Sequence, residues 1–99
     1  MKMKSENRLI ARGDAALSLK GRDKDRLFLV VDVRNGRAFV TDGSVRKTTA
    51  LKAKNVKHLK VLRSGVLTEL SERIRKGEPV ADAKVRNAIS AFNKKSEEE

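Results

Sequence analysis

Apolar and polar residues alternate along the first two thirds of the chain, in short runs separated by glycine-containing turns. Residues 14–19 (DAALSL) and 27–33 (LFLVVDV) both alternate with a period of two, which predicts strands. We expect the odd-numbered apolar residues of both segments to share the inner face of a sheet. Phe28, Val30 and Phe39 then lie on the opposite face.

The pair Asn35-Gly36 predicts a tight hairpin turn, because these residues tolerate the two positive φ angles of a type I′ turn. The turn joins residues 27–33 to a strand in 37–43 (RAFVTDG), which ends in a second turn at Asp42-Gly43. We place a fourth strand in residues 45–51 and a fifth in 56–62. Five short strands in so small a segment indicate a strongly bent barrel, since closure removes exposed strand edges.

The pattern changes near Ser64 from period two to helical spacing. A first helix is indicated up to a left-handed cap at Gly77, and a second begins at Ala81 or Asp82. Their apolar faces comprise Val66, Leu67, Leu70 and Ile74 in the first, and Val85, Ala88, Ile89 and Phe92 in the second. We expect both helices to pack on the face that carries Phe28, Val30 and Phe39, which leaves the basic surface free.

The predicted fold class is therefore mainly β with C-terminal helices, organised as a small five-stranded barrel plus a helical pair. The barrel takes residues 9–63, after a flexible N-terminus of residues 1–8. The helical hairpin takes residues 64–94, and residues 95–99, within the sequence KKSEEE, form a disordered tail.

Composition narrows the class of protein. The chain has 99 residues, of which 38% are hydrophobic and 37% charged, as in a small single domain. The absence of cysteine excludes disulfides and thiolate zinc sites. The longest apolar run, Leu27 to Val31, is far too short for a membrane span, and the initial MKMK precedes no apolar stretch typical of a signal peptide. We expect a cytoplasmic protein.

Positive charge is concentrated in two segments. The formal net charge is +11, and residues 44–68 hold seven basic side chains and no acidic one. Residues 1–26 hold eight basic and four acidic side chains, whereas 69–99 are balanced at seven of each. A charge run is often only a solvated face, but so long a window without a carboxylate favours a polyanionic partner. Nucleic acid is the first candidate and an anionic membrane surface the second.

Two stretches carry a resemblance to a known family. The segment RGDAALSLKGRDKDRLFLVVDV resembles the KOW motif, and VTDGSVRKTTALKAKNVKHLKVL is similar to small bacterial relatives of the archaeal and eukaryotic large-subunit ribosomal proteins that carry this motif. The matching positions of the second stretch are Asp42, Gly43, Arg46, Lys47, Lys52, Lys54, Lys57, His58 and Leu59. The resemblance covers about residues 9–62 and implies an SH3-like barrel that binds RNA, ribosomal RNA above all. The motif has a glycine where this chain has Asp25, and aspartate tolerates a left-handed backbone at a cost of about 1 kcal/mol.

Catalysis is not indicated. The single histidine, His58, has no spaced partner for a triad, and the scattered glycines form no phosphate-binding loop before a helix. Asp23 and Asp25 flank Lys24 and could form a carboxylate pair, but ion pairs with the loop's own basic residues are the simpler interpretation. We expect no enzyme activity, metal, cofactor or small-molecule substrate.

RNA binding fits the residues better, and they restrict its mode. With three phenylalanines and no tyrosine or tryptophan, stacking of bases is not the expected main contribution. The expected main contribution comes from contacts of Lys and Arg to phosphates and 2′-hydroxyls of folded RNA. The candidate RNA-binding residues form a loop patch and a second patch, and the two meet if the loop lies beside Arg46 and Lys47. The loop patch comprises Lys20, Arg22, Lys24 and Arg26. The second patch comprises Arg46, Lys47, Lys52, Lys54, Lys57, His58 and Lys60.

Alternatives remain open at this stage. His58 serves equally well as a packing residue, and any single lysine serves solubility. Ribosomal proteins are possible further partners. A protein-interaction module of the transcription or translation machinery is the main rival function, and an exposed face with Phe28, Val30 and Phe39 would favour it. Binding of duplex DNA through the basic face is a third possible function.

Overall fold

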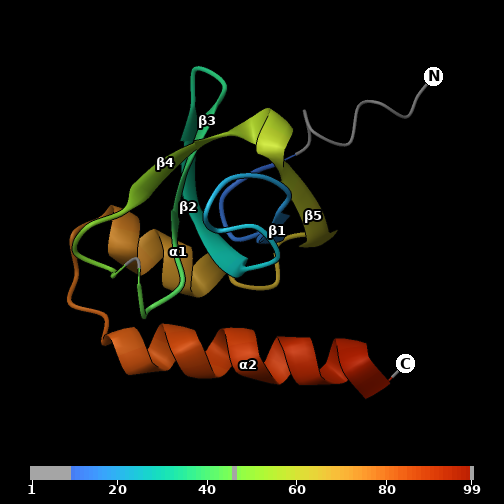
Figure 1. Cartoon of the computed structure of the whole chain (residues 1–99). Coiled ribbons are helices and arrows are strands. Elements are labelled where there is room, and N and C mark those ends of the chain that lie inside the picture. The colour runs from blue at the N-terminus through green and yellow to red at the C-terminus, as the bar shows by residue number, and fades with distance from the viewer. Residues whose placement is uncertain (1–9, 46, 99) are drawn as a thin grey trace.

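The computed structural model describes residues 10–45 and 47–98, with side chains described up to residue 91. This part of the chain contains one antiparallel sheet and two α-helices (Figure 1). The strands are β1 (Ala15–Ser18), β2 (Leu27–Arg34), β3 (Arg37–Thr41), β4 (Lys52–Asn55) and β5 (Leu59–Arg63). The helices are α1 (Thr68–Arg75), α2 (Asp82–Glu98) and the short 3-10 helix η2 (Val56–His58). The predicted class, mainly β with C-terminal helices, is confirmed.

The sheet is strongly curled. Its strand order is β4-β3-β2-β1-β5, so the two edge strands follow one another in sequence and are joined by η2 alone. Irregular registers between Ala15 and Ala16 and between Val30 and Asp32 bend the sheet, as bulges do. No ladder joins β4 to β5 in the described part of the chain, so the sheet is barrel-like but not closed.

The hairpin turn is confirmed at Asn35-Gly36. Asn35 has φ 50° and Gly36 has φ 76°, the two positive values that a type I′ turn requires. Gly77 has φ 84° just beyond α1, as predicted for a left-handed cap, and α2 begins at Asp82. The backbone of α2 continues to Glu98, through most of the segment for which the sequence predicts a disordered tail.

The fourth strand is displaced from its predicted position in residues 45–51. Residues 47–50 form a turn instead, with the amide of Ala50 donating to the carbonyl of Lys47 over 3.0 Å. Contacts with the region preceding α2 hold the turn, because Thr48 donates its amide to Asp82 Oδ1 over 2.8 Å and its hydroxyl to the Val80 carbonyl over 3.0 Å. Strand β4 therefore starts only at Lys52, and β5 starts at Leu59 because η2 takes up residues 56–58.

The assignment of strand faces is wrong: the two faces of β2 are exchanged up to Val31, whereas Val33, beyond the irregular register, packs against the inner cluster. Phe28 and Val30 are fully buried inside the curl of the sheet, whereas Leu29 and Val31 face the helices. The inner cluster consists of Ile10, Ala16, Phe28, Val30, Ala38, Val40 and Leu59. Alternation shows which residues share a face but not which face is inside. The exposed Phe28 and Val30 surface that would favour a protein-interaction module is thus not present.

Both helices cover the outer face of β2 (Figure 1). Val85 of α2 is fully buried against Leu29 and Val31, with Leu70 and Ile74 of α1 beside them. The turn after β3 approaches α2 so closely at Gly43 that a Cβ there would collide with the carbonyl oxygen of Asp82. No helix in residues 10–45 and 47–98 is long and apolar enough to cross a membrane.

Two half-buried carboxylates lie at the junction of helices and sheet. The guanidinium of Arg12 donates to Glu72 over 3.1 Å. This hydrogen bond is the largest cause that lowers the pKa of Glu72 from its ordinary value, and the hydrogen bond from Arg75 is the second. The amide of Thr48 similarly lowers the pKa of Asp82. Both carboxylates are therefore stabilised in their charged form in the folded protein.

Candidate nucleic-acid interface

The loop between β1 and β2 is an ordered turn. The amide of Asp25 donates to the carbonyl of Ser18 over 2.8 Å, and the amide of Arg26 donates to the carbonyl of Asp23 over 2.9 Å. Asp25 has φ 72°, the left-handed conformation that glycine favours. The hydrogen bonds fix the backbone and leave the side chains of Lys20, Arg22 and Lys24 exposed.

Asp23 points into the molecule. It is only 5% exposed, and its Oδ2 lies 3.8 Å from the Nζ atoms of both Lys52 and Lys54. Lys54 Nζ also donates to the carbonyl of Lys20 over 3.3 Å. The sequence predicts ion pairs of Asp23 within its own loop, whereas these contacts join the loop to β4.

Lys54 is therefore not available as the RNA contact that the sequence predicts. Only 8% of the residue is exposed, at an inward position of the edge strand β4. A buried ammonium needs a nearby counter-charge, which Asp23 supplies. Lys52 is partly withdrawn as well, with 32% of its side chain exposed. The counter-charge of Lys52 and Lys54 thus comes from Asp23, which lies outside the basic segment of residues 44–68.

Arg26 is likewise engaged within the fold. Its guanidinium lies 3.1 Å from Oδ2 of Asp42, a nearly buried carboxylate that also accepts the amide of Ser44 over 2.9 Å. The ion pair connects the end of the loop to the turn after β3. Since 41% of the Arg26 side chain remains exposed, it keeps some donors for an external partner.

Three candidates of the second patch lie beside the loop. The amide of Leu19 donates to the carbonyl of His58 over 2.8 Å, and Leu17 on β1 is the register partner of Lys60 on β5. Lys57 and Lys60 are exposed and His58 is half-buried. Together with the exposed residues of the loop they form a set that we call the loop surface: Lys20, Arg22, Lys24, Lys57, His58 and Lys60. None of these six side chains forms an ion pair with another residue of the described ranges.

Two candidates of the second patch, Arg46 and Lys47, are not assigned to this surface. Arg46 lies outside the described residues. Lys47 is exposed, and its charge contributes to lowering the pKa of Asp82, which places it near the start of α2. The second-patch candidates that lie beside the loop are thus Lys57, His58 and Lys60, whereas the meeting predicted at Arg46 and Lys47 stays a prediction.

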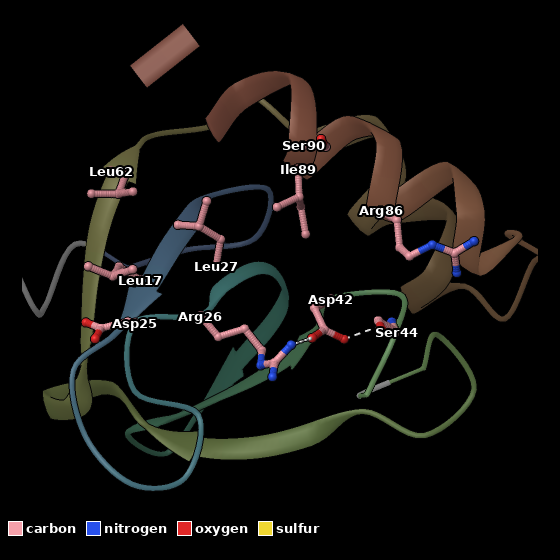
Figure 2. A pocket seen from close by; sticks show the side chains of 10 residues that line it. All are labelled: Leu17, Asp25, Arg26, Leu27, Asp42, Ser44, Leu62, Arg86, Ile89 and Ser90. Atoms are coloured by element: carbon pink, nitrogen blue, oxygen red, sulfur yellow. Dashed lines mark hydrogen bonds and ion pairs between the residues drawn. The ribbon is translucent and has the colours of Figure 1, made fainter. Parts of the chain in front are cut away.

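A groove of about 510 Å³ lies between the sheet and α2 (Figure 2). Leu17 and Leu27 form part of its apolar wall, Ile89 projects into it from α2, and the Arg26–Asp42 pair lies at its edge. Arg86 donates to the carbonyl of Gly43 over 2.8 Å and holds α2 in place there. His58 is not among the lining residues, and the described part of the chain contains no group of three or more His, Cys, Asp or Glu side chains suited to a metal ion.

Sequence reasoning did not consider the hairpin tip as a basic site. Arg34 and Arg37 flank the Asn35-Gly36 turn and are both exposed. The sequence RNGR carries the signal, because an arginine stands on each side of the turn residues.

The chain matches no protein-family model and no curated protein sequence. Arguments about function therefore rest on its own residues and their arrangement.

Proposed function

We propose that this chain is a cytoplasmic, non-enzymatic RNA-binding protein that contacts folded RNA, ribosomal RNA in particular, through the loop surface. The observation that carries the proposal is the gathering of five exposed lysine and arginine side chains at one place without acidic partners in the described chain. Such a surface favours a polyanion, and phosphates supply the regular negative charge that it lacks.

The KOW resemblance supports the same function. A curled five-stranded sheet is compatible with the SH3-like barrel that the resemblance implies, and the left-handed Asp25 retains the backbone of the motif. The cationic side chains of the motif loop then project outward, where an RNA backbone could reach them. Arginine donates to two phosphate oxygens at once, and lysine acts as a point charge.

The salt dependence of binding tests this proposal. Neutralisation of about five phosphates predicts that log affinity for a structured RNA falls against log salt with a slope of roughly −4. Duplex DNA of matched length is the comparison ligand. A flat salt response would exclude an electrostatic interface, and equal affinity for the two nucleic acids would favour general binding of duplexes over recognition of RNA.

A further inference from the structure

The tip of the β2–β3 hairpin has an arrangement of charge that the loop surface does not explain. Arg34 and Arg37 are direct register partners, so two positive charges face each other across the last pair before the turn. Like charges in this position destabilise a hairpin. Asp32 lies 3.5 Å from Arg34 but also 3.3 Å from Arg12, and Arg37 has no ion pair with any residue of the described ranges. The tip therefore has an excess of positive charge.

An aromatic ring lies next to these arginines. Phe39 is half-buried on β3, opposite Asp32, and belongs to neither hydrophobic cluster of the described chain. The guanidinium carbon of Arg34 lies 5.0 Å from the centre of the Phe39 ring, within the range of a cation–π contact. Phe28, by contrast, is fully buried in the core.

The Arg34–Phe39 pair borders two hollows. One, of about 440 Å³, is lined by Arg34, Asn35, Arg37 and Phe39. The other, of about 300 Å³, has Arg34 and Phe39 in its wall together with Asp32 and Arg75. Both volumes fall in the range of ligand-sized sites. The pair is therefore accessible to a flat group.

The hairpin tip is also continuous with the loop surface. The amide of Val56 donates to the carbonyl of Gly36 over 3.0 Å, so η2 with the exposed Lys57 lies directly beside the turn. A nucleic-acid strand that contacts Lys57 thus passes close to Arg34 and Arg37.

From this geometry we propose that the hairpin tip binds one unpaired nucleotide of RNA. The base stacks on the Arg34–Phe39 pair, because aromatic rings and guanidinium planes both accept a nucleobase face. Arg37 holds the adjacent phosphate through its forked donors, and the Asn35 amide is within the same hollow to pair with the base edge. The inference rests on the proposed function and adds one stacking contact to a mainly electrostatic surface.

The test compares two RNA hairpins that differ by a single bulged nucleotide, 2-aminopurine, whose fluorescence reports stacking. We expect the wild-type protein to prefer the bulged RNA by about 5- to 150-fold, the worth of one stacked base, and to change its fluorescence on binding. Phe39→Leu keeps an apolar side chain on β3 and Arg34→Lys keeps the charge. Both should lose the preference while the affinity for the fully paired hairpin and its salt slope stay unchanged.

Thermal melting shows whether each variant is folded. Because the two substitutions lie on different strands, one folded variant is enough to test the site. Equal binding of both RNAs by the wild-type protein, or a retained preference in a folded variant, overturns the nucleotide site alone. If the wild-type protein binds neither RNA, the RNA-binding function itself fails and the site with it.

Discussion

The turns at the two ends of β2 are both rich in charge, but they use it differently. In the loop before β2, Asp23 draws Lys54 and part of Lys52 inward, so charge contributes to folding there. In the hairpin after β2, Arg34 and Arg37 face each other, and only Arg34 pairs with a carboxylate, that of Asp32, which it shares with Arg12. The same type of charge therefore supports the fold before β2 and stays at the surface after it.

The largest expected effect is on stability, from Asp23→Ala. Removal of the carboxylate leaves the ammonium of Lys54 buried without this counter-charge, which should lower the free energy of unfolding by about 3 kcal/mol in urea denaturation. Arg37→Ala at the hairpin is the control, and should change stability by less than about 0.5 kcal/mol. Equal effects of the two substitutions would show that both turns use charge alike.

Lys54→Met sharpens the same comparison. It keeps most of the side chain's length but removes the charge, so it should cost less than Asp23→Ala. In the double variant Asp23→Ala/Lys54→Met the loss should be smaller than the sum of the single losses, and a strictly additive result would argue against the pair.

A smaller effect concerns the backbone, in which the two turns are alike. Asp25→Ala in the loop and Gly36→Ala in the hairpin both put alanine at a left-handed position, with φ 72° and 76°, and each should cost about 1 kcal/mol. A Cβ at Gly36 meets nothing within 4 Å, so its cost is purely conformational. Asp25→Gly should remain within about 0.5 kcal/mol of the wild type, since glycine relieves the left-handed strain but loses more backbone entropy on folding, and the two effects nearly cancel. A large loss from Asp25→Gly would instead assign the aspartate side chain a role in the fold.

The smallest effect is a pH dependence outside both turns. Because the folded-state pKa of Asp82 is lowered, its contribution to stability is present above about pH 4, its unfolded pKa, and disappears as the pH falls through the folded value. The stability difference between the wild type and Asp82→Asn should therefore shrink as the pH is lowered below about 4. A difference that is constant from pH 7 to pH 2 would contradict the charge of Asp82 as the cause.

The sequence predicted local features well. The Asn35-Gly36 turn, the strand from Leu27 and the helix boundaries at Gly77 and Asp82 all depend on the conformational preferences of nearby residues. The left-handed backbone conformation of Asp25 is another such local feature.

Three of the errors depend on contacts between distant residues. The turn at Thr48 is fixed by Val80 and Asp82, more than thirty residues away, so alternation in residues 45–51 gave a strand that does not form. The exchanged faces of β2 and the burial of Lys54 likewise depend on which elements pack where. Charge counting could not find Asp23 as the partner of β4, because the two lie in different segments.

The central claim is that the loop surface, rather than net charge, binds RNA, and a matched pair of charge reversals tests it. Arg22→Glu/Lys24→Glu changes the loop surface, and Lys76→Glu/Lys84→Glu makes the same change in net charge at exposed positions near the helices. We predict that the first pair weakens binding of a structured RNA and reduces the steepness of its salt slope by about 1.4 to 1.8, while the second leaves both nearly unchanged. Equal weakening by both pairs would contradict the account, because binding would then follow net charge alone.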